Sequence, residues 1–241
     1  MPRADEVRAE YLLTEGLEPS AIAAAAAILS GSENARAASF LRPKNRRDYI
    51  AAHALLRQAL SRRHPLPPRE WSFEIKPGGK PMLAAPFAEA AGLSFNLAHT
   101  DGLVACIVTD GVEAGIDVER VDRAGDSLEI ARRYFAPDEY ARLETCAPEV
   151  RSRRFVELWT LKEAALKATG DGITASLDGF SFETDDSLAI RVDAPAGERA
   201  LDWQFGLFAP FPAYRLAVAI RWPAQEPRAI SAVAVNLDAA Y

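Results

Sequence analysis

The chain has 241 residues, of which 49% are hydrophobic and 26% charged, a composition typical of a folded globular protein and not of a disordered one. Its formal net charge of −6 disfavours binding to nucleic acid through overall charge. The two isolated cysteines, Cys106 and Cys146, argue against a disulfide scaffold and a zinc array. The charged N-terminus does not resemble a secretory signal, and the apolar stretch 21–29 is too short to span a bilayer. We therefore expect a cytoplasmic protein without membrane contact.

The first half of the chain combines helical and extended patterns. Pro19 and Ser20 are typical of a helix start, and Gly31 is expected to end that helix. The pair Asp110-Gly111 predicts a two-residue hairpin. The expected elements are a strand at 7–13, helices at 19–30 and 43–63, and strands at 71–75, 93–97, 103–109 and 112–120.

The second half begins with helices and ends with strands. Pro137 and Pro148 suit the first turn of a helix, and Gly170 suits a helix end. The expected helices are 127–134, 137–146 and 149–169, and the expected strands are 179–183, 188–192, 201–208, 214–220 and 230–235. This order predicts an α+β fold without βαβ alternation. A break near Gly111 predicts two small α+β subdomains, 1–111 and 112–241.

The string GIDVE at 115–119 is the first candidate for chemistry. In a strand, side chains alternate between faces, so Asp117 and Glu119 share one face. Two neighbouring carboxylates suit Mg²⁺, which binds one or two carboxylates together with substrate phosphate oxygens. The alternative is a half-exposed strand with its polar face in water, because the motif is short and common.

The second candidate is the helix that carries WTLKEAALKATGDG. Its apolar side chains form one arc, and Lys162 falls within that arc. A buried ammonium needs an anion or must reach water, so Lys162 favours a helix that faces a polar cleft. Glu163 and Lys167 lie four residues apart beside Trp159. Such a pair is also an ordinary surface contact worth only about 0.2–0.5 kcal/mol.

The third candidate is a basic segment from Arg36 to Arg63, with eight Arg or Lys against Asp48 alone. In an acidic chain, this asymmetry indicates a local anion site, although a solvated helix face is an equal alternative. Lys80 follows two glycines that let the backbone approach a ligand closely. His99 follows a short strand, where it could donate to a phosphate or cap a turn.

Four strings occur in a fixed order: FNLAHT, GIDVER, FAPDEY and WTLKEAALKATGDG. In sequence and spacing they resemble the Sfp-type 4′-phosphopantetheinyl transferases, and the resemblance extends from about Arg36 to Glu183. It implies transfer of 4′-phosphopantetheine from coenzyme A to a serine of acyl or peptidyl carrier protein domains, with release of adenosine 3′,5′-bisphosphate. It also implies two α+β subdomains related by a pseudo-twofold axis, with the active site at their interface.

The resemblance also implies roles for individual residues. Asp117, Glu119 and Glu163 correspond to Mg²⁺ ligands, and Lys167 to the lysine on the diphosphate. The implied coenzyme A phosphate contacts are Lys44, Arg47, Lys80 and His99, with Lys44 the looser match. Ala98 stands where many relatives have serine, which removes one hydroxyl contact to phosphate.

The implied reaction displaces adenosine bisphosphate from the β-phosphorus of coenzyme A by the carrier serine. Glu163, or a metal-bound water that it orients, is the candidate base, with Lys167 neutralising charge on the diphosphate. We expect a monomer without nucleic-acid partners. We also expect a carrier-docking surface in the segment 124–143, which carries Arg132, Arg133, Tyr134, Phe135 and Tyr140. The alternatives are a non-catalytic coenzyme A-binding protein on the same fold and a Mg²⁺-dependent phosphodiesterase.

Overall fold

The computed structural model describes residues 6–75, 81–85, 92–123, 127–170, 177–194, 199–223 and 226–237. Helices and strands are mixed along the chain, which confirms the predicted α+β class. The chain divides into two units, Met1–Gly111 with Ser231–Tyr241, and Val112–Ile230. The structure describes each unit by itself, so the predicted pseudo-twofold axis and interfacial active site stay predictions.

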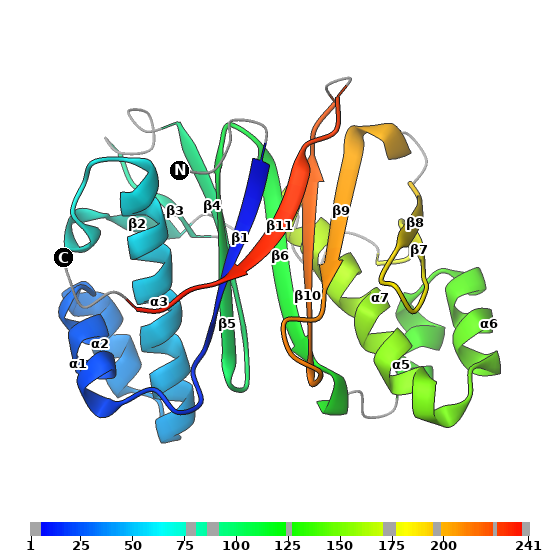
Figure 1. Ribbon diagram of the computed structural model, residues 1–241, viewed down its shortest axis with the longest axis horizontal. Helices are drawn as coiled ribbons and strands as arrows, with labels where there is room; N and C mark the ends of the chain where they lie inside the picture. Colours follow the sequence, from blue (N-terminus) through cyan, green and yellow to red (C-terminus); the bar gives the residue numbers. More distant parts are fainter. Residues whose placement is uncertain are drawn as a thin grey trace. The chain divides into compact units, whose positions relative to one another are not determined.

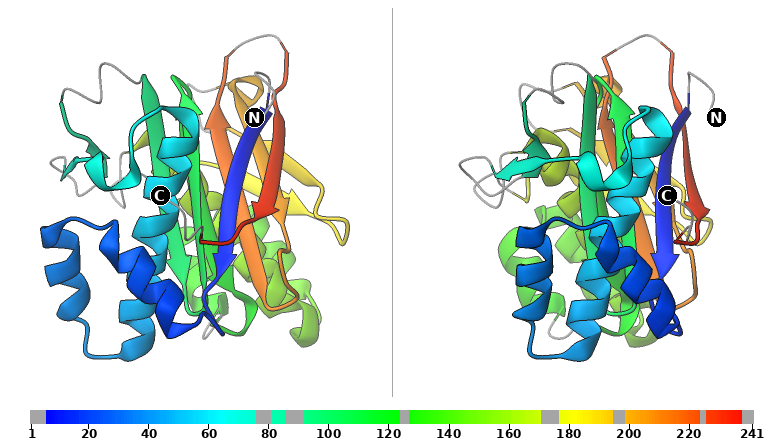
Figure 2. Two further views of the ribbon diagram at one scale, coloured as in Figure 1. Left: turned by 60° about the vertical axis from the view of Figure 1, so that its left-hand side comes forward. Right: turned by 90° about the vertical axis from the view of Figure 1, so that its left-hand side faces the viewer.

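The first unit is a four-stranded sheet with the order β11-β1-β5-β4, covered by helices. Strand β5 runs antiparallel to both β1 and β4. Helix α3 packs along one face of this sheet, where Leu55, Leu56 and Leu60 meet Val104 and Cys106 (Figures 1 and 2). The elements are β1 (Glu6–Leu13), α1 (Pro19–Ala27), α2 (Gly31–Ala38), α3 (Pro43–Arg63), β2 (Phe73–Ile75), β3 (Pro81–Leu83), β4 (Leu93–Thr100), β5 (Leu103–Asp110) and β11 (Ala229–Ala234).

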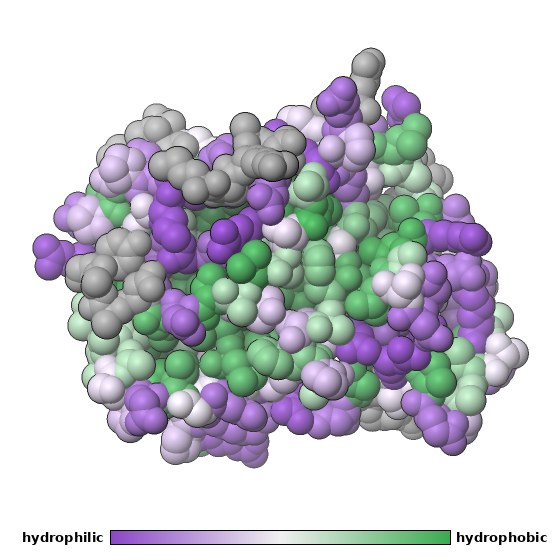
Figure 3. All heavy atoms as spheres, viewed as in Figure 1, coloured by the Kyte–Doolittle hydropathy of each residue, from purple (hydrophilic) through white to green (hydrophobic). Residues whose placement is uncertain are grey.

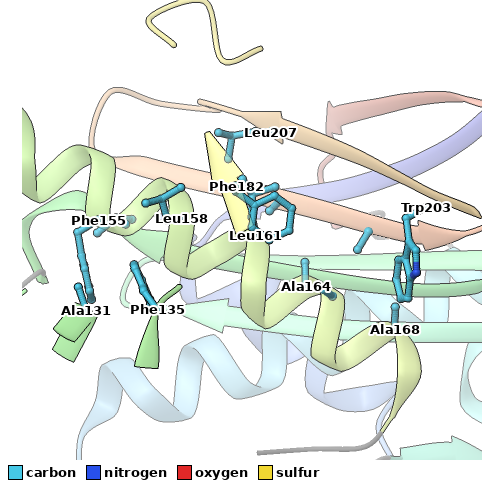
Figure 4. Close-up of a cluster of buried hydrophobic side chains, with 14 of the residues drawn as sticks. Ala131, Phe135, Phe155, Leu158, Leu161, Ala164, Ala168, Phe182, Trp203 and Leu207 are labelled. Atoms are coloured by element: carbon cyan, nitrogen blue, oxygen red, sulfur yellow. The ribbon is translucent and has the colours of Figure 1, made fainter. Parts of the chain in front are cut away.

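The second unit is built on an antiparallel sheet with the order β6-β10-β9. Helix α7 packs on this sheet through Leu161, Ala164 and Ala168, in a core that includes Phe182 and Trp203 (Figure 4). The elements are β6 (Glu113–Arg120), α5 (Ser127–Tyr134), α6 (Pro137–Thr145), α7 (Pro148–Thr169), β7 (Ser181–Thr184), β8 (Ile190–Asp193), β9 (Trp203–Phe208) and β10 (Tyr214–Arg221). Strands β7 and β8 form a separate two-stranded sheet.

Apolar side chains remain at the surface of the second unit beside its edge strand β9. They line an open groove of about 560 Å³ together with residues of β8, and Figure 3 shows hydrophobic residues gathered there. A Cβ at Gly206 of β9 would lie 2.9 Å from the ring of Phe208 and 3.0 Å from Cγ2 of Ile230, the last residue of the second unit.

Three sequence predictions differ from the structure. Gly31 begins helix α2 and does not end α1, because Ser30 and Glu33 form a capping box there. Asp110-Gly111 is not a hairpin turn, because β5 pairs with β1 and β4 whereas β6 pairs with β10. The predicted second subdomain, 112–241, is too long at its C-terminal end, because β11 joins the first unit beside β1.

Candidate active site

One face of β6 is directed toward helix α7, and Gly115 lies at the closest approach. A Cβ at Gly115 would lie 2.0 Å from the backbone oxygen of Ala164 and 2.5 Å from the backbone nitrogen of Ala168. Real Cβ atoms essentially never come this close, so only glycine fits. Asp117 and Glu119 share the face of Gly115, because side chains alternate along a strand. The close approach therefore brings both acids beside α7.

Helix α7 carries the two other predicted site residues of this unit. Lys167 Nζ donates a hydrogen bond of 2.6 Å to Asp117 Oδ1, across 50 positions of the sequence. Asp117 is 6% exposed. Its second oxygen, Oδ2, is buried and has no hydrogen-bond partner. A buried carboxylate oxygen without a partner is unfavourable by about 1–3 kcal/mol, so Asp117 offers a position for a further cation.

Glu163 is half-buried one turn before Lys167 on the same helix. Burial raises its pKa, the charge of Asp117 raises it further, and Lys167 opposes the shift. Glu163 and Asp117 are therefore close enough to repel each other. Repelling carboxylates of this kind are stabilised by a shared divalent cation.

The three predicted Mg²⁺ ligands are only partly brought together. Asp117 and Glu119 share the α7-facing side of β6, and Glu163 interacts electrostatically with Asp117. Within the described part of the chain, however, no group of three or more His, Cys, Asp or Glu side chains is arranged to hold a metal ion. The unpartnered Oδ2 of Asp117 fits a cation, and the complete three-carboxylate site stays a prediction.

Lys162 does not face a polar cleft, contrary to the sequence interpretation. Its side chain is 1% exposed and forms an ion pair of 2.7 Å with Glu139 of α6. It also donates to the backbone oxygens of Leu177 and Phe180. Burial lowers the pKa of Lys162 and raises that of Glu139, although the two charges attract each other. Lys162 is therefore a structural link between α7, α6 and the segment before β7.

Sequence reasoning missed a second buried ion pair beside the site. Arg215 of β10 lies opposite Glu119 in the sheet, and its Nε donates to Glu157 Oε1 at 3.0 Å. Glu157 is fully buried and also accepts from Arg154 at 3.0 Å. The available signal was an arginine inside the otherwise apolar run YRLAVAI.

The predicted phosphate contacts in the first unit gather near the turn between β4 and β5. Lys44 Nζ pairs with Asp101 of this turn at 2.6 Å. Arg47 pairs with Asp48, and Asp48 accepts from the backbone N–H of Gly102. His99 is exposed at the end of β4 and within electrostatic range of His53 on α3.

Two further predictions have different outcomes. Lys80 lies outside the described residues. Phe135, expected on a carrier-docking surface, is 5% exposed and stacks on Phe155 with ring centroids 5.2 Å apart. It belongs to the core of the second unit, whereas Arg132 and Arg133 are exposed.

Two family models match consecutive parts of the chain. The 4′-phosphopantetheinyl transferase superfamily model matches residues 113–219, and a model for the N-terminal part of 4′-phosphopantetheinyl transferases matches residues 18–110. The 4′-phosphopantetheinyl transferase psf-1 of Bacillus pumilus is 31% identical over 175 residues, which cover 73% of this chain and 71% of the relative. The chain belongs to the 4′-phosphopantetheinyl transferase family.

Other 4′-phosphopantetheinyl transferases match over different lengths. HetI of Nostoc sp. is 41% identical over 61% of this chain, and the match spans 62% of HetI. For a putative 4′-phosphopantetheinyl transferase of Synechocystis sp., 37% identical, the match spans 61% of the relative. The chain thus spans about three fifths of the length of these two relatives. Among solved structures, a holo-(acyl-carrier-protein) synthase from Bacillus anthracis in complex with CoA (3′,5′-ADP) aligns with 45% of this chain and 95% of its own chain. The sequence identity is 17% and the TM-score is 0.38, and this likeness is too weak to support an inference.

None of the helices in the described residues is both long enough and apolar enough to cross a membrane.

Proposed function

We propose that this chain transfers the 4′-phosphopantetheine group of coenzyme A to a serine hydroxyl of an acyl or peptidyl carrier protein domain. Adenosine 3′,5′-bisphosphate is the other product. Membership of the 4′-phosphopantetheinyl transferase family supports the reaction class. The observation that carries the assignment to particular residues is the contact of Lys167 with the buried Asp117, whose second oxygen has no hydrogen-bond partner.

The cationic residues of the first unit supply donors for the phosphates of coenzyme A. Lys44, Arg47 and His99 lie around one turn, and we propose that they bind the 3′-phosphate. The carboxylates of Asp101 and Asp48 now accept from Lys44 and Arg47, and they hold these side chains in place before the substrate arrives. A phosphate would compete for the same donors, because charge-assisted hydrogen bonds to phosphate are among the strongest in proteins.

The carboxylates of the second unit suit a divalent cation. Asp117, Glu119 and Glu163 would hold Mg²⁺, because this ion prefers oxygen ligands and is usually bound by carboxylates together with substrate phosphate oxygens. When bound, Mg²⁺ neutralises charge on the diphosphate of coenzyme A. Lys167 lies 2.6 Å from Asp117 Oδ1, which orients its ammonium toward the same region as the carboxylates. That ammonium would donate to the diphosphate and stabilise the departing bisphosphate.

The proton of the carrier serine needs an acceptor during the transfer. As the bond from serine Oγ to the β-phosphorus forms, the bond from that phosphorus to the bridging oxygen breaks, and the bridging oxygen leaves with adenosine bisphosphate. Glu163, or a metal-bound water that it would orient, is our candidate for the proton acceptor, because Glu163 is half-buried beside Asp117 on the helix that also carries Lys167. The nucleophile belongs to the carrier, and neither Cys106, which is buried, nor Cys146, which is half-buried, is needed for the reaction.

The test combines the purified chain, coenzyme A, Mg²⁺ and several apo-carrier domains, and measures the mass of each carrier. The expected result is a gain of one phosphopantetheine, lost in Glu163→Gln and Asp117→Ala. Glu149→Gln is the matched control, because Glu149 is exposed in the first turn of the same helix. No gain with any carrier, together with tight coenzyme A binding, would identify a binding protein instead. Magnesium-dependent cleavage of nucleic acid would identify a phosphodiesterase.

A further inference from the structure

A cavity of about 210 Å³ lies within the first unit, at the C-terminal end of α3. Its walls come from the last turns of α3 and from the neighbouring strands β1 and β5, which Figure 1 shows beside each other. The lining residues are Arg8, Glu10, Ala59, Arg62, Arg63, Cys106 and Val108. No residue of the proposed transfer site is among them.

The charge of this cavity is predominantly positive. Three guanidinium groups line it, and the single acidic residue in the lining is Glu10. Glu10 forms an ion pair with Arg62, and its oxygen lies 3.9 Å from Arg8 Nε. Arg63 interacts at 3.4 Å with Asp110, whose side chain is 67% exposed and screened by water. One carboxylate inside the cavity therefore balances only part of its positive charge.

One of these guanidinium groups has a donor without an acceptor. Arg8 Nε is buried from solvent and has no hydrogen-bond partner. Buried polar groups in folded proteins are almost always hydrogen-bonded, and a buried donor without an acceptor is unfavourable. An oxyanion in the cavity would accept from Arg8.

The arrangement favours a tetrahedral oxyanion. Arg8 comes from a strand, and Arg62 and Arg63 come from successive positions of a helix, so their donors approach from different directions. A phosphate presents oxygens in several directions, whereas a carboxylate presents two oxygens in one plane. The volume is about seven times that of a liquid water molecule, which is ample for a phosphate group.

This cavity is separate from the proposed coenzyme A contacts of the same unit. Arg47 and Arg62 are 15 positions apart on α3, and a helix rises 1.5 Å per residue, so they are about 22 Å apart along it. A single phosphate therefore contacts one group or the other.

We infer that the cavity between the C-terminal end of α3 and strands β1 and β5 is a second anion site, which binds a phosphate group through Arg8, Arg62 and Arg63. The phosphate is either inorganic or the terminal group of a small organic ester. Glu10 has a defined role in this site: it holds Arg62 in place and competes with the anion for it. Cys106 lines the cavity as a neutral thiol, since burial raises its pKa well above the usual value.

The experiment measures phosphate binding by calorimetry and ³¹P NMR. All measurements use the full chain with Arg47→Gln, which weakens competing phosphate binding at the proposed coenzyme A site. Inorganic phosphate, diphosphate and glycerol 3-phosphate are titrated separately, and these arms distinguish a free anion from an ester. Saturable binding of at least one of them is expected. No saturable binding of any of the three would overturn the inference.

Substitutions then test whether the bound phosphate is in the cavity. Arg8→Gln and Arg63→Gln should each weaken binding about 10- to 100-fold, since each removes a charge-assisted hydrogen bond. Arg69→Gln is the matched control, because Arg69 is exposed in the same unit and outside the cavity. Two arginine variants are used so that a folding defect in one leaves the other informative. Unchanged binding in both would refute the inference.

Glu10→Gln gives a result of opposite sign. If the cavity binds anions, removing the competing carboxylate should tighten phosphate binding by about tenfold, because Glu10 then no longer competes with the anion for Arg62. If the arginines and Glu10 are only a structural ion-pair cluster, this variant would lower thermal stability without improving phosphate binding. That second outcome would contradict the inference.

Discussion

Gly115→Ala tests whether the close packing of β6 on α7 positions the site. The new Cβ would lie 2.0 Å from a backbone oxygen of α7, and ordinary contacts begin at 3.4 Å. The strand and helix must therefore separate by about 1.4 Å, since neither contacted atom belongs to a flexible side chain. The contact of Lys167 with Asp117 would lengthen from 2.6 Å to about 4 Å, which is outside hydrogen-bond range.

Two measurements follow from this separation. Overpacking of a well-packed core lowers stability by about 1–3 kcal/mol, and a clash with backbone should reach the upper end of that range. Urea unfolding of the variant should show this loss. The rate of carrier modification should fall about 100-fold or more, because a misplacement of catalytic groups by about 1 Å has an effect of that size. Gly31→Ala is the control, because a Cβ there meets nothing within 4 Å. If Gly115→Ala kept full stability and activity, the close approach would not be what positions Asp117.

Three further outcomes are expected. Glu139→Gln should lower the free energy of unfolding by about 3–5 kcal/mol, because Lys162 would remain buried without its carboxylate, and urea titration measures this. Lys167→Met should lower carrier modification about 100- to 1000-fold and the free energy of unfolding by about 1–3 kcal/mol, because the buried Asp117 would lose its donor. Burial raises the pKa of Glu33, but hydrogen bonds from Arg57 and Ser30 outweigh burial and lower it below 4.5. Its contribution to stability is therefore present above pH 4.5 and lost as the pH falls below it, and Glu33→Gln should flatten that part of a stability-versus-pH curve.

Local patterns predicted most helices and strands well. The α3 and α7 helices begin at prolines, and α7 ends at Gly170 in the left-handed conformation, so their bounds follow from backbone chemistry alone. The error at Gly31 has the same origin, because a glycine also fits the first turn after a capping serine. The competing signal, Ser30 followed three positions later by Glu33, was present in the sequence.

Pairings between distant segments were not predictable in the same way. Asp110-Gly111 has the composition of a hairpin turn, but β5 pairs with β1 and β4 whereas β6 pairs with β10. These pairings join segments that are distant in the sequence, so the turn residues alone do not predict them. Lys162 in an apolar arc needed either water or an anion, and nothing local indicates that Glu139 supplies the anion. The contact of Lys167 with Asp117 was not predicted, because 50 positions separate the two residues and the family resemblance implied only that each has a role in the active site.

The position of β11 affects the order in which the chain acquires structure during synthesis. The first unit receives most of its edge strand β11 from residues that follow the second unit, which ends at Ile230. On the ribosome, the second unit can emerge completely while β1 still lacks its outer neighbour. An exposed strand edge invites pairing with other chains, so nascent or C-terminally truncated molecules should aggregate through β1.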